Sequence, residues 1–237
     1  GIAVGWRVTF LIIAAIAFGV LGLLAAVLKK SPSDNNFSLR KLPALIKTPS
    51  LWGIYLLTLV AISGHFTAYS YIEPFLSRIA GLGNNAITVV LTLFGAVDLV
   101  GSFIFSRHYN NNVETFFKMA VAGLCFCLLM LLPASCTEWS AFLQCMLWGL
   151  SINFFNLSFQ SEIIRHAPQG TAVAMSIYSG IYNVGIGTGA LVGGSVCDGI
   201  GIRYIGYVGG AIALAAVIYC IRHVVPVLRR ATAGAEI

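Results

Sequence analysis

Two side chains that can exchange protons lie inside apolar stretches of the sequence. His65 is followed four residues later by Tyr69, so both lie on one face of a helix predicted at residues 51–73. An imidazole titrates near neutral pH and can respond to a proton gradient, although a hydrogen-bonded histidine can also serve helix packing alone. Asp98 is the acidic residue well inside a predicted helix, and either a solute or proton contact or a bond to a helix neighbour fits it. We predict His65 and Asp98 as candidates for proton coupling.

A second set of polar residues suits the hydroxyl groups of an uncharged solute. Asn153, Asn156 and Gln160 recur at spacings of three and four, which places them on one face of a helix predicted at residues 139–160. Their amides donate and accept hydrogen bonds, so they fit a sugar. They fit hydrogen bonds between helices equally well.

The helix predicted at residues 171–197 combines polar and small residues. Tyr182 and Asn183 are candidates for lining the same cavity, and aromatic packing is the competing interpretation for the tyrosine. Small residues at every fourth position let helix backbones approach closely. A phosphate-binding loop is excluded, because no strand precedes the glycines and no Lys follows them. We therefore predict helix packing for Gly185, Gly189 and Gly193.

The elements that position these residues are predicted to cross a membrane. Charged residues make up 9% of the 237 residues and hydrophobic residues 58%, whereas a soluble domain has about 25% charged residues. Roughly 20 apolar residues in a helix cross a bilayer core about 30 Å thick. The sequence thus predicts an all-α, polytopic membrane protein and excludes a water-soluble fold. Seven transmembrane helices are expected, at residues 8–28, 51–73, 86–106, 116–134, 139–160, 171–197 and 203–223.

Basic residues are divided unequally between the two sets of loops. Eleven Lys and Arg residues lie in one set of alternate loops, and Arg7, Arg78 and Arg203 lie in the other. The positive-inside rule places the richer set, and the C-terminus, in the cytoplasm. This distribution explains the net charge of +6 without a nucleic-acid partner. The six cysteines lie mostly in apolar runs without a CxxC pair, so we predict buried thiols and neither a metal site nor a cofactor.

Several stretches of the chain match motifs of one transporter family. They are residues 5–10 (GWRVTF), residues 52–76 with the run GHFTAYSYIEPFL, residues 101–102 with Arg107, and the glycine-rich residues 183–194. Together they resemble the major facilitator superfamily, specifically the sugar efflux group of its drug:proton antiporter branch. The resemblance covers essentially the whole chain and implies helices six to twelve of that fold. Since the chain opens on Gly1 and not on Met, we expect a truncated sequence whose helices one to five are missing.

The resemblance implies a layout for the chain. Residues 1–28 would be an outer loop and the last helix of the N-terminal half, 29–50 a cytoplasmic central loop, 51–223 the six-helix C-terminal half, and 224–237 a cytoplasmic tail. Arg107 would lie in the cytoplasmic loop after helix eight. There His108, Tyr109 and three Asn follow it, where the family often has an Asp.

The function that the resemblance implies is proton-coupled efflux of sugars such as arabinose across a bacterial inner membrane. The expected partners are a small solute, protons, the lipid bilayer and the N-terminal half. Multidrug export and nucleoside or amino-acid export on the same scaffold are alternatives. A seven-helix receptor or intramembrane enzyme is a different class, but GxSG, HExxH and GxGD motifs are absent and residues 203–223 contain no Lys. The expected solute contacts are His65, Tyr69, Asn153, Asn156, Gln160, Tyr182 and Asn183.

Overall fold

The structure, a computed structural model, describes residues 6–27, 48–111, 113–168 and 170–233. All regular secondary structure in those ranges is helical, which confirms the predicted all-α membrane class. The chain divides into two compact units, residues 1–36 and 37–237. Most of the expected central loop at 29–50 lies outside the described residues.

The first unit contains one long apolar helix, α1 (Trp6–Val27). After Arg7 it has no charged residue and no proline to interrupt it. Its 22 residues extend about 33 Å at the α-helical rise, enough to cross a bilayer core. Large apolar side chains are exposed along its length, including Phe18 at 75%. A helix that is apolar on every side needs lipid or protein around it.

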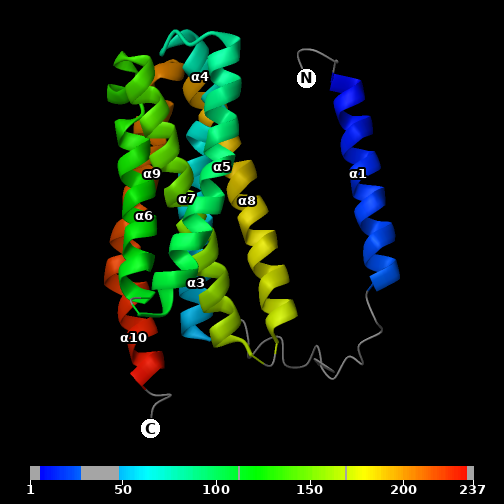
Figure 1. The fold of residues 1–237 in the computed structure, drawn as a ribbon. Coiled ribbons are helices and arrows are strands. Elements are labelled where there is room, and N and C mark those ends of the chain that lie inside the picture. Colours follow the sequence, from blue (N-terminus) through cyan, green and yellow to red (C-terminus); the bar gives the residue numbers. More distant parts are fainter. Residues whose placement is uncertain (1–5, 28–47, 112, 169, 234–237) are drawn as a thin grey trace. The chain divides into compact units, whose positions relative to one another are not determined.

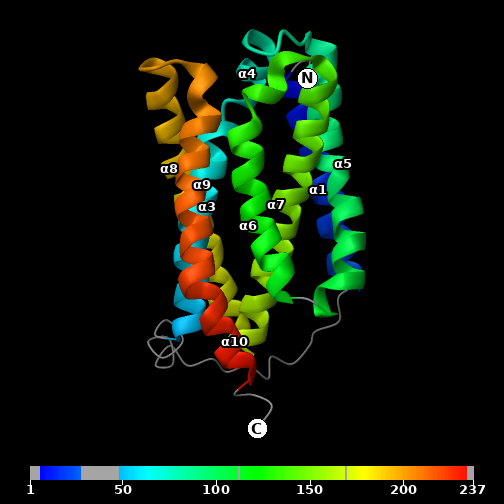
Figure 2. The ribbon, with the colours of Figure 1, turned by 90° about the vertical axis from the view of Figure 1, so that its left-hand side faces the viewer.

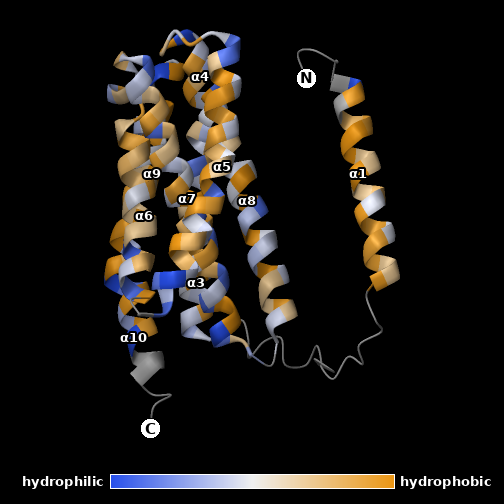
Figure 3. Cartoon of the chain, viewed as in Figure 1, coloured by the Kyte–Doolittle hydropathy of each residue, from blue (hydrophilic) through white to orange (hydrophobic). Residues whose placement is uncertain are grey.

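The second unit is a bundle of long helices that run side by side (Figures 1 and 2). Polar residues gather at the two ends of the bundle, and apolar residues predominate between them, with some polar segments on α7 and α8 (Figure 3). The elements of this unit are α3 (Pro49–Tyr69), α4 (Ile72–Arg78), α5 (Asn84–His108), η2 (Tyr109–Asn111), α6 (Val113–Met130), η3 (Pro133–Cys136), α7 (Glu138–His166), α8 (Thr171–Asp198), η4 (Ile202–Tyr204), α9 (Ile205–Tyr219), η5 (Cys220–Val224) and α10 (Val225–Ala233).

Local sequence signals set several helix ends. Pro49 occupies the first turn of α3, where its missing N–H costs no hydrogen bond. Thr137 caps α7, because its side-chain oxygen accepts a hydrogen bond from the Ser140 backbone N–H at 3.2 Å. Gly201, between α8 and α9, has φ of 102°, a conformation that favours glycine and permits the tight turn there.

The helices agree with the predicted spans, with two differences in extent. Six helices among the described residues are long and apolar enough to cross a membrane. The remaining predicted span, residues 171–197, corresponds to α8, whose 28 residues are less apolar because they include many glycines and polar side chains. α7 continues to His166, six residues beyond the predicted end at 160, because apolar helical periodicity persists through Ile163 and Ile164. The last span continues through a π-turn, η5, into α10.

α3 lies at the centre of the bundle and contacts both α8 and α9 closely. Gly185, Gly189 and Gly193 of α8 are all buried against it. A Cβ on Gly189 would lie 2.5 Å from the Ser63 carbonyl oxygen. On the α9 side, Gly64 and Gly209 meet reciprocally, and a Cβ on Gly64 would lie 2.7 Å from the Gly209 carbonyl oxygen. Glycine thus sets the spacing of α3 from both of its neighbours.

At one end of the second unit, an ion pair between side chains joins α10 to α6. Arg229 donates from Nε to Glu114 Oε2 at 2.5 Å and from its Nη2 to Oε1 at 2.7 Å. Lys118 pairs with the same carboxylate. We call this end the basic end, since it carries Arg107, Lys118, Arg165, Arg222 and Arg229.

Candidate functional site

His65 occupies a buried position near the C-terminal end of α3, with only 3% of its surface exposed. Its Nδ1 accepts a hydrogen bond from Trp148 Nε1 of α7 at 3.1 Å. The indole N–H can only donate, so the acceptor in this pair is the imidazole. Trp148 itself is fully buried.

The two rings that form this bond belong to a group of four rings from three helices. His65 stacks on Tyr69 with centroids 5.1 Å apart, and Trp148 meets both rings edge-on, at 5.4 and 6.0 Å. Phe94 of α5 completes the group, 5.3 Å from Tyr69 and 5.8 Å from Trp148. We call His65, Tyr69, Phe94 and Trp148 the aromatic cluster. The sequence analysis did not include Trp148 or Phe94, although both lie on predicted spans.

A set of polar groups adjoins the aromatic cluster. The Tyr69 phenol lies within electrostatic range of Asp98 on α5 and of Tyr182 on α8. The Tyr182 hydroxyl in turn lies near the Asn156 side chain of α7. Asp98 is exposed, and the other three are partly buried. These four residues, here named the polar face, come from four different helices and bring together side chains far apart in the sequence.

Two buried polar atoms beside the polar face lack a protein partner within the described residues, Asn156 Oδ1 and the Tyr178 hydroxyl. The Tyr178 ring lies 5.8 Å from that of Tyr182. Buried polar groups are nearly always hydrogen-bonded in proteins, so unpaired ones identify places where a ligand or another polar group fits.

The remaining candidates are placed differently. Asn153 is buried with its Oδ1 close to Gly101 of α5, in the contact between α5 and α7. The Asn183 amide is exposed and donates to the Ser179 carbonyl oxygen of its own helix at 2.7 Å. Gln160 is partly buried one turn beyond Asn156. The structure therefore joins His65, Tyr69, Asn156 and Tyr182 in one region and does not join Asn153 or Asn183 to it.

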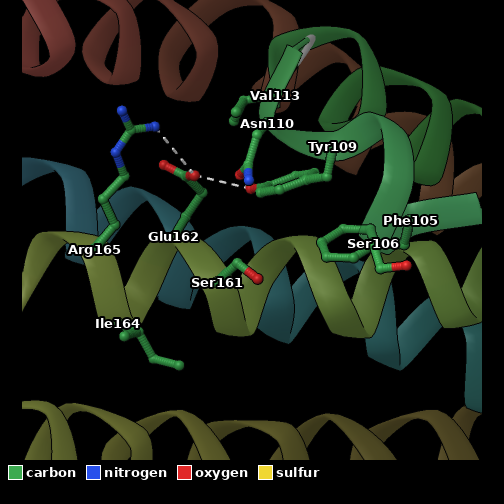
Figure 4. A pocket seen from close by; sticks show the side chains of 9 residues that line it. All are labelled: Phe105, Ser106, Tyr109, Asn110, Val113, Ser161, Glu162, Ile164 and Arg165. Atoms are coloured by element: carbon green, nitrogen blue, oxygen red, sulfur yellow. Dashed lines mark hydrogen bonds and ion pairs between the residues drawn. The ribbon is translucent and has the colours of Figure 1, made fainter. Parts of the chain in front are cut away.

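A second polar site lies at the basic end, in a pocket of about 540 Å³ between the end of α5 and the end of α7 (Figure 4). Glu162 is only 2% exposed, and its Oε1 accepts a hydrogen bond from the Tyr109 hydroxyl at 2.8 Å. Arg165 Nη1 lies 3.8 Å from Oε1, and His166 Nδ1 lies 3.5 Å from Oε2. The lining residues are Phe105, Ser106, Tyr109, Asn110, Val113, Ser161, Glu162, Ile164 and Arg165.

The bond between Tyr109 and Glu162 connects the segment after α5 to α7. Burial raises the pKa of Tyr109, and the negative charge of Glu162 raises it further, so the phenol stays a protonated donor at neutral pH. Arg107 lies beside the Phe103 ring, 6.0 Å from its centroid, and forms no ion pair within the described residues. The contact across this pocket is therefore made by Tyr109.

Glu162 was missed by the sequence analysis because the predicted span ended at residue 160. Two signals could have found it. The apolar residues Ile163 and Ile164 continue the helix, and Arg165 and His166 supply positive charges at the spacings of three and four that pair side chains on one helix face. In the described part of the chain, His, Cys, Asp and Glu do not form a group that could hold a metal ion.

A helical bundle of membrane-spanning length with a polar face assembled from several helices is the architecture of a membrane transporter. The chain belongs to the Major Facilitator Superfamily, whose family model matches residues 1–174. It is 45% identical over 210 residues to a probable sugar efflux transporter of Pasteurella multocida, covering 89% of this chain and 52% of that protein. Proteins of the same name from Helicobacter acinonychis and Helicobacter pylori are each 44% identical over 214 residues, covering 90% of this chain and 55% of theirs. The chain spans about half the length of these curated relatives.

Proposed function

We propose that this chain forms the C-terminal part of a secondary transporter that exports small sugars by alternating access. The observation that carries the proposal is the polar face, where Tyr69, Asp98, Asn156 and Tyr182 converge from four helices. The names of the relatives support the substrate class, and arabinose is the test sugar of choice. An N-terminal half with helices one to five is the proposed partner.

The chemistry of the polar face suits a polyhydroxylated solute. The Asn156 amide and the tyrosine hydroxyls can each donate and accept hydrogen bonds, as sugar hydroxyls do. The unpaired Asn156 Oδ1 and Tyr178 hydroxyl would gain partners when such a solute binds. The Tyr69 and Tyr182 rings offer apolar faces to the C–H groups of a pyranose. A bound sugar thus completes hydrogen bonds that the protein alone leaves open.

Asp98 is the proposed proton-coupling group of this half. It is the acidic residue that faces Tyr69, and a carboxylate in a membrane is costly unless it is protonated, paired or hydrated. Protonation from the outer side would neutralise it and allow the bundle to change its orientation. Release of the proton to the cytoplasm would restore the charge and reset the site for the next sugar.

The orientation that we propose places the basic end in the cytoplasm of a bacterium, in the inner membrane. Among the described residues of the second unit, six Lys and Arg residues belong to the basic end, counting Arg230 of α10, whereas Arg78 and Arg203 lie at the other end. This follows the positive-inside rule. It puts the pocket beside Glu162 on the cytoplasmic side and the C-terminus inside the cell.

Efflux of radiolabelled arabinose from preloaded cells tests the proposal. The chain is expressed alone and together with the N-terminal half of the Pasteurella multocida relative, and export is expected only from the pair. Asn156→Ala should slow export severalfold, because it removes hydrogen bonds from the polar face. Ser195→Ala is the matched control, since Ser195 is exposed and bonds only to its own helix. Equal export by the Asn156 variant and the control would remove the polar face from the solute path.

Export of organic cations is a second candidate on the same scaffold. It is favoured by one specific observation, the exposed Asp98 carboxylate beside the Tyr69 ring, because cations bind both carboxylates and aromatic faces. Ethidium efflux by the same pair of chains distinguishes the two. Ethidium export without arabinose export, abolished by Asp98→Asn, would replace the sugar proposal.

A further inference from the structure

The hydrogen bond between Trp148 and His65 determines which imidazole nitrogen carries the proton. Indole Nε1 has a hydrogen and no lone pair to accept with, so it must be the donor at 3.1 Å. His65 Nδ1 must then be the acceptor and carry no proton. A neutral imidazole with a bare Nδ1 has its proton on Nε2. The bond therefore selects one neutral tautomer of His65.

Packing on all sides keeps the His65 ring in this orientation. Tyr69 stacks on it with an interplanar angle of 18°, and Trp148 and Phe66 meet it at 77° and 88°. The preceding residue, Gly64, lies against the α9 backbone, so α3 has no room to rotate at this level. The imidazole is thus held between the indole that fixes its tautomer and the Tyr69 ring that belongs to the polar face.

We infer that His65 is a positioning residue, which Trp148 locks as a neutral acceptor so that it holds the Tyr69 ring against the solute, and that it does not carry the transported proton. The tautomer assignment rests on the hydrogen bond alone. The contact between Tyr69 and a solute rests on the function proposed above. The inference gives His65 a different role from the proton coupling that the sequence suggests.

The surroundings of His65 oppose its protonation. Of the rings that contact His65, the titratable one is Tyr69 on its own helix, while Phe66 and the Trp148 ring of α7 do not titrate. No carboxylate in the described part of the chain forms an ion pair with it, and Asp98 faces Tyr69 instead. A proton on Nδ1 would point two N–H groups at each other and leave a buried charge without a partner.

Nitrogen NMR of the 237-residue chain in detergent micelles tests the tautomer without any transport assay. All four histidines are labelled with ¹⁵N, and spectra are recorded from pH 5 to pH 8. His65 is assigned from the signal that disappears in His65→Asn. We expect it to keep a bare Nδ1 and a protonated Nε2 throughout this range. A His65 signal that titrates between pH 5 and pH 8, or that shows a protonated Nδ1, would overturn the inference.

Transport variants test the positioning role in cells that contain both halves. Trp148→Phe removes the donor and His65→Leu removes the acceptor, and each is expected to raise the KM for arabinose about fivefold, the effect of one lost hydrogen bond, with the maximal rate and the pH profile retained. His65→Asn keeps an acceptor near the position of Nδ1 and should restore the KM. A changed pH profile in His65→Asn would refute the positioning role. If the unmodified pair exports no sugar, the proposed function fails, whereas the NMR result still decides the tautomer.

Discussion

The bond between Tyr109 and Glu162 allows a sharp test of how the basic end is held together. Tyr109→Phe removes one hydroxyl and leaves the ring, which stacks on Phe105 at 4.2 Å, in place. The carboxylate that loses the donor is 2% exposed and has two other partners, at 3.5 and 3.8 Å, both beyond ordinary hydrogen-bond length.

The expected cost follows from the charge of the acceptor. A hydrogen bond to a charged group contributes about 1.5–3 kcal/mol, so we expect Tyr109→Phe to lower the free energy of unfolding by about 2 kcal/mol. In Glu162→Gln the acceptor is neutral and the same hydroxyl is worth about 1 kcal/mol. The double-mutant cycle should thus give a coupling energy of about 1 kcal/mol between the two residues.

Unfolding by SDS in mixed micelles, followed by circular dichroism, measures these energies. Tyr207→Phe is the matched control, because Tyr207 lies on the same bundle and is 40% exposed. The free energy of unfolding of the Tyr207→Phe variant should stay within about 0.5 kcal/mol of that of the unmodified chain. A Tyr109→Phe variant as stable as this control, or a coupling energy of zero, would show that the phenol does not hold α7 to the segment after α5.

Three further predictions follow from the contacts described above. Gly189→Ala should lower the free energy of unfolding by about 1–3 kcal/mol, because its Cβ would meet the Ser63 carbonyl oxygen. Gly187→Ala is the control in the same SDS titration and should be neutral or slightly stabilising, because the space around Gly187 is open. Asp98→Asn should abolish the response of sugar export to an imposed pH gradient while labelled sugar still binds, and retained acceleration by outside acid would assign proton coupling elsewhere. Arg107→Ala should leave the free energy of unfolding unchanged within about 0.5 kcal/mol, since its guanidinium forms no ion pair within the described ranges. A larger loss would reveal a contact at this end of α5.

The sequence predicts the spans well because hydropathy and charge act along the chain itself. The helices of residues 51–73 and 86–106 appear as α3 with α4 and as α5, and polar residues gather at the bundle ends as expected. Helix ends are less predictable, because a polar residue inside a helix can be buried by a partner elsewhere. Glu162 is such a case, since Tyr109, which bonds to it, lies 53 residues away.

The candidate site illustrates the same limit. Spacing correctly put His65 and Tyr69 on one helix face, where their rings stack. Spacing also grouped Asn153 with Asn156, yet Asn153 lies against Gly101 on the neighbouring helix α5. Which residues of a helix face meet a cavity depends on how neighbouring helices are rotated, and no periodicity within one helix encodes that rotation. Trp148 could not be predicted as a site residue for the same reason. A tryptophan in an apolar span is expected to pack in the core, and only the structure shows that its N–H donates to the His65 imidazole.

The π-turn η5 has a consequence for the last residues of the chain. A π-turn inserts one extra residue into an α-helix, and one residue rotates everything after it by about 100° around the axis. With that offset, Arg229 reaches the Glu114 carboxylate on α6. Removing a single residue between 220 and 224 would move the Arg229 guanidinium to another side of the helix. The ion pair that joins α10 to α6 would then be lost. Whether α10 binds to α6 therefore depends on the presence of one extra residue in η5, and not on the charges of Arg229 and Glu114 alone.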